Sequence, residues 1–276
     1  MADLKTLYVT DLDGTLMRND QTLSEYTVTT LNRLIDEGFN ITYATARSFT
    51  SAHKITEDLK IKIPVITRNG TTFADQIRNE ETEISRFSPE QLDKLKNILK
   101  GLIETRGFVS AYFGKTMNKT YMFGDLCEGL DKYVSYYKND KRMVGVENYE
   151  DLFKGIVTYI TIIDEREVLE PYYEEIRKAG DWETVFSKDT YDKEFWLEIC
   201  PTNATKAKAV QKLKDRLGLD RIVVFGDSVN DLSMFAVADE ACAVSNAIDE
   251  LKASATKIIL SNEEDGVARF IEEDHN

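Results

Sequence analysis

The chain has 276 residues and a mass of 31.5 kDa, a size that fits one large domain or two modest ones. Its 42% hydrophobic and 30% charged residues are typical of a soluble globular protein and exclude collagen-like and disordered classes. Thirty-five Lys and Arg against 49 Asp and Glu give a net charge of −14, which argues against nucleic acid or an anionic membrane surface as a partner.

The first 80 residues alternate short apolar runs with amphipathic segments. We expect strands over residues 7–10, 39–44 and 64–67, and helices between Ser24 and Gly38 and over residues 48–59. Strand–helix–strand units of this kind predict parallel pairing with right-handed crossovers.

The same pattern returns near the C-terminus. The expected elements there are a helix over 202–217, a strand over 221–225, a helix over 230–236, a strand over 242–244, a helix over 247–253, a strand over 257–260 and a last helix after Gly266. The two ends of the chain are therefore expected to form one α/β core with a doubly wound, mostly parallel sheet, which is a Rossmann-like arrangement.

The middle of the chain differs in composition. Residues 84–200 hold 10 of the 13 Tyr, 7 of the 13 Phe and both Trp. They combine a helical periodicity over 91–102 with β-rich runs over 157–163 and 195–199. We interpret 84–200 as an inserted α+β cap domain and 1–83 with 201–276 as the core. The alternative is one larger domain, which we favour less because the α/β pattern breaks off and then resumes.

Cysteine and histidine offer little chemistry. Cys127, Cys200 and Cys242 lie far apart without C-x-x-C spacing, so we expect inert thiols, and two histidines cannot form a His-rich metal site. No run approaches the roughly 18 apolar residues of a membrane helix. The N-terminus has no apolar signal core, so we predict a cytoplasmic protein without a membrane partner.

The strongest local signal is the run from Thr10 to Leu16, directly after the first expected strand. Ligands of doubly wound sheets bind at the carboxyl ends of the strands. The spacing lets Asp11 and Asp13 project toward one site while Leu12 points away, and Gly14 permits a sharp exit of the backbone.

A second acidic cluster, from Gly226 to Asp231, follows a strand near the other end of the chain. Taken alone, it also fits a helix start capped by Asp227 with a solvated Asp231. Two acidic clusters above one sheet would repel each other unless a cation lay between them. Carboxylate oxygens suit Mg²⁺, which commonly keeps waters and phosphate oxygens as its other ligands.

Two further residues fit a phosphate site. Thr45 closes the second expected strand and offers a hydroxyl and a backbone N–H. Lys206 lies in the first turn of its expected helix, where a point charge and free N–H groups favour an anion. Lys206 alone would equally fit an ordinary surface lysine.

These motifs together resemble the haloacid dehalogenase (HAD) superfamily, in particular its Cof-type phosphatases with a large class IIB cap between the second and third motifs. The matching stretches are, in order, Asp11 to Thr15, Ala44 to Arg47, Lys206 after Glu198 to Pro201, and Gly226 to Asp231, with Asn69-Gly70, Ser245-Asn246-Ala247 and Glu264 to Val267 as further matches. The resemblance covers the whole chain but is specific only in the core. It departs from the family at Ala46, Ala207 and Ser245, where glycine is usual.

The resemblance implies a phosphatase mechanism. Asp11 would attack phosphorus and form an aspartyl-phosphate, and Asp13 would act as general acid and then base. Mg²⁺ would be held by Asp11, Asp227 and the backbone carbonyl of Asp13, with Asp231 as a ligand or close by. The residues implied to contact the phosphate or the leaving group are Leu12, Gly14, Thr45, Ala46, Arg47, Asn69, Lys206 and Asn230.

The implied partner is a small phosphate monoester, with sugar phosphates ahead of nucleotides and cofactor phosphates. Three alternatives stay open. A phosphomutase shares the fold, a signalling receiver also holds an aspartyl-phosphate with Mg²⁺, and a non-enzymatic binding protein could keep the same fold. The cap and the acid two residues after the nucleophile argue against the receiver. The oligomeric state is not predicted.

Overall fold

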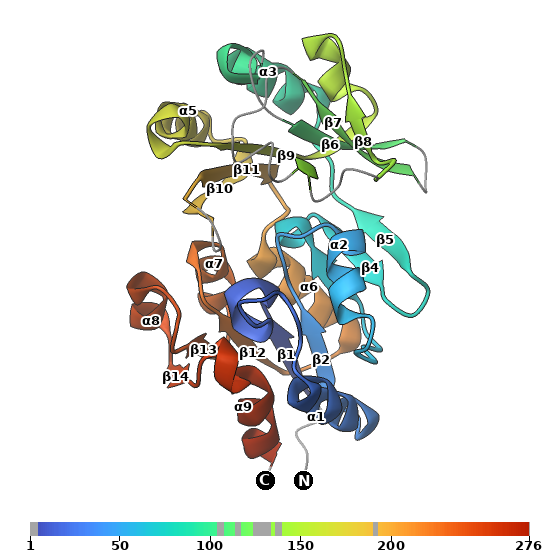
Figure 1. Ribbon diagram of the computed structural model, residues 1–276, viewed down its shortest axis with the longest axis vertical. Helices are drawn as coiled ribbons and strands as arrows, with labels where there is room; N and C mark the ends of the chain where they lie inside the picture. The colour runs from blue at the N-terminus through green and yellow to red at the C-terminus, as the bar shows by residue number, and fades with distance from the viewer. Residues whose placement is uncertain are drawn as a thin grey trace. The chain divides into compact units, whose positions relative to one another are not determined.

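The computed structural model describes residues 5–103, 108–113, 117–123, 134–135, 140–189 and 193–275 (Figure 1). The chain divides into two compact units, one made of Met1–Ile84 with Ala204–Asn276 and the other of Ser85–Asn203.

A five-stranded parallel sheet forms the centre of the first unit, in the order β14-β13-β12-β1-β2. Its strands are β1 (Thr6–Thr10), β2 (Asn40–Tyr43), β12 (Arg221–Gly226), β13 (Glu240–Val244) and β14 (Lys257–Ile259). Strand β1 pairs with β2 on one side and with β12 on the other, so segments from both ends of the chain meet at the centre of the sheet. The predicted α/β core with a parallel sheet is confirmed.

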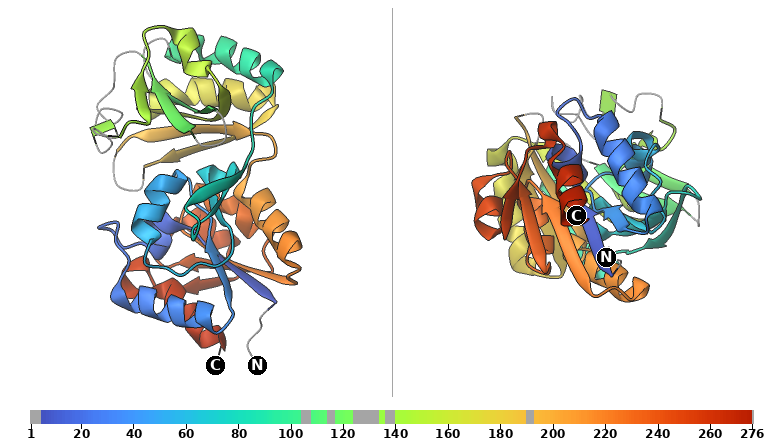
Figure 2. Two further views of the ribbon diagram at one scale, coloured as in Figure 1. Left: turned by 90° about the vertical axis from the view of Figure 1, so that its right-hand side faces the viewer. Right: turned by 90° about the horizontal axis from the view of Figure 1, so that it is seen from below.

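Helices cover both faces of this sheet. They are α1 (Glu25–Asp36), α2 (Phe49–Thr56), α6 (Lys206–Leu217), α7 (Leu232–Phe235), α8 (Asp249–Ser254) and α9 (Gly266–His275). Helix α1 packs beside α9, whereas α7 packs between α6 and α8 on the opposite face (Figure 2). Right-handed crossovers that leave β1 and β12 in opposite directions produce this division.

The third predicted strand does not extend the parallel sheet. Strand β3 (Val65–Thr67) pairs antiparallel with β4 (Thr72–Asp75), which pairs antiparallel with β5 (Glu80–Ile84). A single parallel bridge from Ala44 to Ile66 joins β3 to the end of β2. Residues 68–70 have φ angles of 50°, 51° and 100°, and this left-handed turn folds β4 back onto β3.

Local capping explains where two helices begin. The Ser24 hydroxyl accepts the N–H of Thr27 at 2.9 Å at the start of α1, an N-cap worth about 1 kcal/mol. Helix α6 starts at Lys206, later than predicted, because the preceding strand runs through Pro201 and Thr205 caps the helix by accepting the N–H of Lys208.

The second unit contains a six-stranded sheet in the order β10-β11-β9-β6-β7-β8, antiparallel except for the β7–β8 pair. Its elements are α3 (Pro89–Ile103), β6 (Phe108–Phe113), β7 (Met117–Met122), β8 (Met143–Gly145), β9 (Ile156–Asp164), α5 (Arg166–Ala179), β10 (Trp182–Lys188) and β11 (Phe195–Pro201). Leucines and isoleucines of α3 and α5 form one apolar cluster with those of β9 and β11. Glu198 alternates with Leu197 and Ile199 of that cluster, so it lies on the other face of the sheet.

Two cysteines fit the expected inert role. Cys200 and Cys242 are buried thiols outside any disulfide, and burial raises the pKa of the Cys242 thiol to about 12. Cys127 lies outside the described residues. Among those residues, no helix combines the length and the apolar character needed to cross a membrane.

Candidate active site

Asp11 stands at the carboxyl end of the central strand β1. Its N–H donates to the carbonyl of Phe225 on β12 at 2.9 Å, so the sheet itself fixes its backbone. The chain then makes a tight turn over Leu12–Leu16, in which Gly14 has a φ of 71°. A Cβ atom at Gly14 would lie 2.4 Å from Oδ2 of Asp227, so the turn approaches the second acidic cluster too closely for any side chain.

Lys206 joins the two acidic clusters. Its Nζ donates to Oδ1 of Asp11 at 2.6 Å and to Oδ1 of Asp231 at 2.7 Å, and all three side chains are at most 5% exposed. Burial lowers the pKa of Lys206, but the attraction of Asp11 and Asp231 outweighs it and raises that pKa above the ordinary value. The lysine is therefore a fixed positive charge within a buried acidic site, which consists of Asp11, Asp227, Asp231 and Lys206 itself.

Burial makes the carboxylates of this site harder to ionise. Burial raises the pKa of Asp11 to about 7, against the attraction of Lys206. Burial, with the charges of Asp231 and Asp11, also raises the pKa of Asp227 well above its usual range. One ammonium group does not compensate three carboxylates, so a further cation would favour their ionised forms.

Asp231 has a largely structural set of contacts. Its Oδ2 accepts the backbone N–H groups of Asp227 at 2.9 Å and of Ser228 at 3.2 Å, while its Oδ1 accepts Lys206. A Cβ atom at Gly226 would lie 2.6 Å from Oδ2 of Asp231. Asp231 thus closes the loop that presents Asp227.

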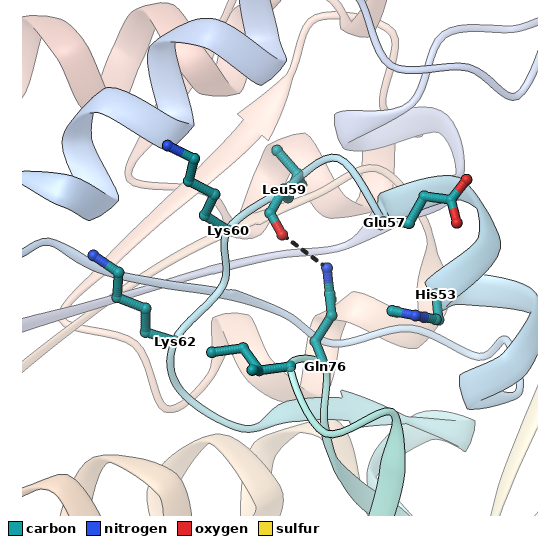
Figure 3. A pocket seen from close by; sticks show the side chains of 7 residues that line it. His53, Glu57, Leu59, Lys60, Lys62 and Gln76 are labelled. Carbon is teal, nitrogen blue, oxygen red and sulfur yellow. Dashed lines mark hydrogen bonds between the residues drawn. The ribbon is translucent and has the colours of Figure 1, made fainter.

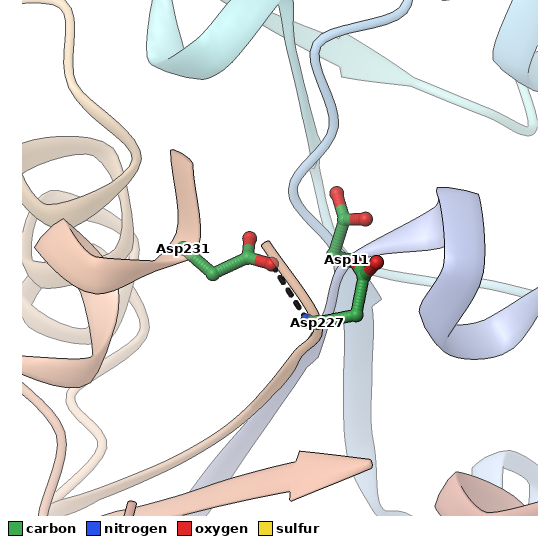
Figure 4. A group of neighbouring side chains, drawn as sticks. All are labelled: Asp11, Asp227 and Asp231. Carbon is green, nitrogen blue, oxygen red and sulfur yellow. Dashed lines mark hydrogen bonds between the residues drawn. The ribbon is translucent and has the colours of Figure 1, made fainter. Parts of the chain in front are cut away.

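Three carboxylates could hold a metal ion. One oxygen each from Asp11, Asp227 and Asp231 lies within 4.8 Å of the others, and the three converge from the end of β1 and the segment after β12 (Figure 4). The donors are all hard oxygens, which fit Mg²⁺. The Thr15 hydroxyl donates to Oδ1 of Asp227 at 3.1 Å and orients it. Because Asp231 already accepts three donors, Asp11 and Asp227 are the better placed ligands.

Asp13 is oriented differently from Asp11, and its carboxylate is not part of this cluster. Arg47 binds it in bidentate fashion, from Nε to Oδ2 at 2.8 Å and from Nη2 to Oδ1 at 2.6 Å. Arg47, which was predicted to contact phosphate or leaving group, thus points at the predicted general acid. The pair is partly exposed, with 19% of the Arg47 and 23% of the Asp13 side chain accessible.

Thr45 and the left-handed turn after β3 lie next to the start of α6 and so belong to the same site. Thr45 is fully buried, its Oγ1 accepts the N–H of Arg47 at 3.1 Å, and its carbonyl accepts the N–H of Asn69 at 2.9 Å. A Cβ atom at Gly70 would lie 2.3 Å from the carbonyl oxygen of Thr205, so this turn abuts the start of α6. Thr45, Asn69 and Lys206 are thereby brought into one region.

Asn230 lies beside that turn. Its Nδ2 is 3.5 Å from Oδ1 of Asn69, and its own buried Oδ1 has no hydrogen-bond partner within the part of the chain that the structure describes. A buried acceptor of this kind is available to a donor group of a ligand. Leu12 buries its side chain in the core and Ala46 offers only a methyl group, so each could serve a phosphate only through its backbone.

Residues that were not predicted also build the site. Asn246 donates from Nδ2 to the carbonyl of Gly14 at 2.7 Å, and Asn262 donates from Nδ2 to the carbonyl of Met17 at 2.9 Å. Gln21 accepts Nη2 of Arg47 at 2.9 Å. Asn246 contacts the first motif and Asn262 contacts the residue that follows it, each from more than 200 residues away. Only the Ser-Asn-Ala run around Asn246 gave any signal in the sequence.

A hollow at another place in the first unit is lined by His53, Glu57, Leu59, Lys60, Lys62, Gln76 and Ile77 (Figure 3). Both lysines pair with Asp36, at 3.0 and 2.9 Å. Gln76 donates to the carbonyls of Thr56 and Leu59. The polar side chains that line this hollow are therefore largely used by the fold, and none of them belongs to the buried acidic site.

Comparison with known proteins gives the family of the chain. The family model of haloacid dehalogenase-like hydrolases matches residues 8–271. Two phosphatases of Bacillus subtilis, both named 5-amino-6-(5-phospho-D-ribitylamino)uracil phosphatase, are similar along their length. YwtE is 30% identical over 284 residues (95% of this chain and 96% of the relative), and YitU is 29% identical over 291 residues (97% and 96%).

A solved structure shares the fold. BT4131, a sugar phosphatase of HAD subclass IIB, superposes with a TM-score of 0.76 at 18% identity, and the match covers 98% of both chains. The buried acidic site after β1 and β12, the match along nearly the whole chain and the phosphatases among its relatives lead to one conclusion: this chain belongs to the haloacid dehalogenase-like hydrolases and is a phosphatase of that family.

Proposed function

We propose that the protein is a Mg²⁺-dependent phosphatase that hydrolyses small phosphate monoesters through an aspartyl-phosphate on Asp11. The observation that carries the proposal is a cluster of three buried carboxylates, each with one oxygen within 4.8 Å of the others, of which Asp11 and Asp231 bind the buried Lys206. Such a cluster combines a nucleophile with the positive charge that a dianionic ester requires, which is the usual division of labour in phosphoryl transfer.

Asp11 acts as the nucleophile in this proposal. One of its oxygens is held by Lys206, which leaves the other to attack phosphorus. The new bond joins Oδ of Asp11 to phosphorus, and the bond between phosphorus and the ester oxygen breaks with its electron pair on that oxygen. Thr45, Asn69 and the first turn of α6 supply hydroxyl and N–H donors for the remaining phosphate oxygens.

Asp13 supplies the proton in this proposal. Its carboxylic acid form protonates the leaving ester oxygen, and the resulting carboxylate then takes a proton from the water that attacks the aspartyl-phosphate. One residue serves in both directions, and the cycle returns Asp13 to its protonated form.

Asp11 and Asp227, with the backbone carbonyl of Asp13, would hold the Mg²⁺ ion. When bound, the cation neutralises the charge of the phosphate and of the carboxylates that face it. Without it, a dianionic ester would meet a repulsion of about 1 kcal/mol per pair of like charges at 4 Å even in water, and more in a drier site.

The leaving group is an alcohol of a sugar or polyol in this proposal. The similar phosphatases from Bacillus subtilis are named for a substrate whose phosphate sits on a ribityl chain. We assign its selection to residues 85–203, the unit that holds 10 of the 13 Tyr. Tyrosine hydroxyls can hydrogen-bond the hydroxyls of a polyol.

A panel of phosphate esters tests the proposal. The panel contains sugar, polyol and nucleotide phosphates, pyridoxal phosphate, FMN and 5-amino-6-(5-phospho-D-ribitylamino)uracil, and kcat/KM is measured with Mg²⁺ and with EDTA. We expect turnover of a sugar or polyol ester that stops on chelation and returns with added Mg²⁺. Full activity in EDTA would exclude the role given to Asp227, and a requirement for a phosphorylated activator without release of phosphate would indicate a phosphomutase.

A further inference from the structure

Arg47 holds both oxygens of Asp13, which poses a problem for the proton transfer described above. A carboxyl oxygen that carries a proton cannot accept a hydrogen bond along the same direction, so one of the two contacts has to open before Asp13 can act as an acid. The contact at Oδ2 comes from Nε, and the contact at Oδ1 comes from Nη2. If Arg47 depended on Asp13 alone for its position, the guanidinium would lose its orientation whenever Asp13 turned.

Gln21 offers Arg47 a second anchor. Nη2 carries two hydrogens, and while one points at Oδ1 of Asp13 at 2.6 Å, the other is accepted by Oε1 of Gln21 at 2.9 Å. The contact from Nη1 to the hydroxyl of Ser51 is longer, at 3.4 Å. Gln21 therefore binds the same nitrogen as Asp13 and can keep it in place when Asp13 releases it.

The backbone around Gln21 is unusual for this residue type. Gln21 has a φ of 64°, in the left-handed region that favours glycine and asparagine. It closes a turn in which its N–H donates to the carbonyl of Arg18 at 2.9 Å and the N–H of Arg18 donates to the carbonyl of Thr22 at 3.0 Å. The turn needs no glutamine, so its side-chain contact with Arg47 is what this position adds.

We propose that Gln21 is a positioning residue for leaving-group protonation and that it acts through Arg47 on Asp13. The inference rests on the proposed phosphatase function and extends it. The amide oxygen of Gln21 fixes the guanidinium, and the guanidinium keeps its contact with Oδ2, which limits the rotation of the Asp13 carboxyl as Oδ1 turns to the ester oxygen. The proton passes from Asp13 to that oxygen as its bond to phosphorus breaks.

Esters whose leaving groups differ in basicity distinguish a role of Gln21 in protonation from a purely structural role. An alkoxide needs a proton to leave, whereas p-nitrophenolate leaves readily without one, so protonation by Asp13 matters for alkyl esters and hardly for p-nitrophenyl phosphate. A defect in positioning Asp13 should therefore depend on the substrate. A general loss of structure should lower the rates for both esters equally.

The experiment compares Gln21→Met, which keeps the side-chain length without an acceptor, with Gln21→Glu, which keeps an oxygen at the same reach. The control is Thr22→Val, which removes the hydroxyl bond from Thr22 to Asp20 in the same turn. For each protein, kcat and KM are measured with Mg²⁺ on p-nitrophenyl phosphate and on the alkyl phosphate that the wild type hydrolyses fastest.

We expect Gln21→Met to lower kcat on the alkyl ester about tenfold and on the aryl ester less than about twofold, with little change in KM. Gln21→Glu should recover most of the rate on the alkyl ester, and Thr22→Val should show no dependence on the substrate. Equal losses on both esters, no loss on the alkyl ester, or a substrate-dependent loss in Thr22→Val would each overturn the inference. A wild type that hydrolyses neither ester would contradict the proposed function instead.

Discussion

Asp11 and Asp13 are two residues apart, yet their surroundings differ in almost every respect. Asp11 is buried beside Lys206 and two other carboxylates, and its contacts come from strands and a helix of the parallel sheet. Asp13 is partly exposed and is held by the side chain of Arg47, which belongs to a loop. A rigid surrounding suits a group that has to meet phosphorus in line, whereas a side-chain partner permits the small rotation that an acid needs before it donates its proton.

The largest loss of activity should come from replacing Asp11, the buried carboxylate. Asp11→Asn replaces the attacking carboxylate with a weak nucleophile of the same shape, so turnover should fall by at least about 10⁴-fold on every ester. Steady-state phosphate release measures the loss, and circular dichroism should show an unchanged fold. Activity near the wild-type level in Asp11→Asn would remove Asp11 as the nucleophile.

Replacing Asp13, the partly exposed carboxylate, should give a smaller loss that depends on the substrate. Asp13→Asn keeps the shape but cannot deliver a proton, so the rate on alkyl phosphates should fall about 100-fold or more. The loss on p-nitrophenyl phosphate should be much smaller, because that leaving group does not need the proton. If both esters lose the same factor, Asp13 does not act as a general acid.

The ion pairs of Lys206 with Asp11 and Asp231 can be tested through the free energy of unfolding. Lys206→Met leaves buried carboxylates without their ammonium partner, which should cost about 3 kcal/mol of unfolding free energy in the absence of Mg²⁺. Urea denaturation of the two proteins gives the difference. Lys208→Met, on the exposed side of the same helix, is the control. A loss of the same size in both variants would show that helix propensity, rather than the buried charge, is responsible.

The raised pKa values predict how Mg²⁺ and pH act together. The pKa of Asp11 lies at about 7 in the folded protein against an ordinary value of 3.8, so the metal-free fold keeps a proton that the unfolded chain loses. Metal-free stability should therefore fall as the pH rises through this window, and Asp227 acts in the same direction. Added Mg²⁺ competes with those protons, so the Tm increase that it causes should be larger at about pH 8 than at about pH 6.

Thermal melting with and without Mg²⁺ at the two pH values measures this linkage, with Asp227→Asn as the variant that should lose the shift. Equal Tm increases at both pH values would mean that Mg²⁺ does not replace protons on these carboxylates.

The sequence was informative where a motif coincides with the end of a strand. Apolar runs followed directly by acids predicted that Asp11 and Asp227 lie at one edge of a sheet, and the pairing of β1 with β12 brings them together. Thr45 could be placed beside them for the same reason, because it follows β2. These inferences need only the direction of parallel strands.

The sequence was uninformative where contacts are distant or depend on a turn. The antiparallel pairing of β3 depends on the left-handed conformation of residues 68–70, which Arg68 adopts against the preference of its residue type. The contact of Asn246 with Gly14 depends on the packing of a C-terminal loop. Arg47 was expected to contact the phosphate or the leaving group, but nothing in the local sequence shows that its guanidinium binds Asp13.

The turn at Arg68–Gly70 has a mechanical consequence. Its backbone is bonded to Thr45 and packs against Thr205 with no room for a side chain at Gly70, and Asn69 faces Asn230. Three segments that are far apart in the sequence thus contact the same turn. Thermal fluctuations of the loop after β2, the start of α6 and the loop after β12 should therefore be correlated, so that the spacing between them varies less than the position of each one.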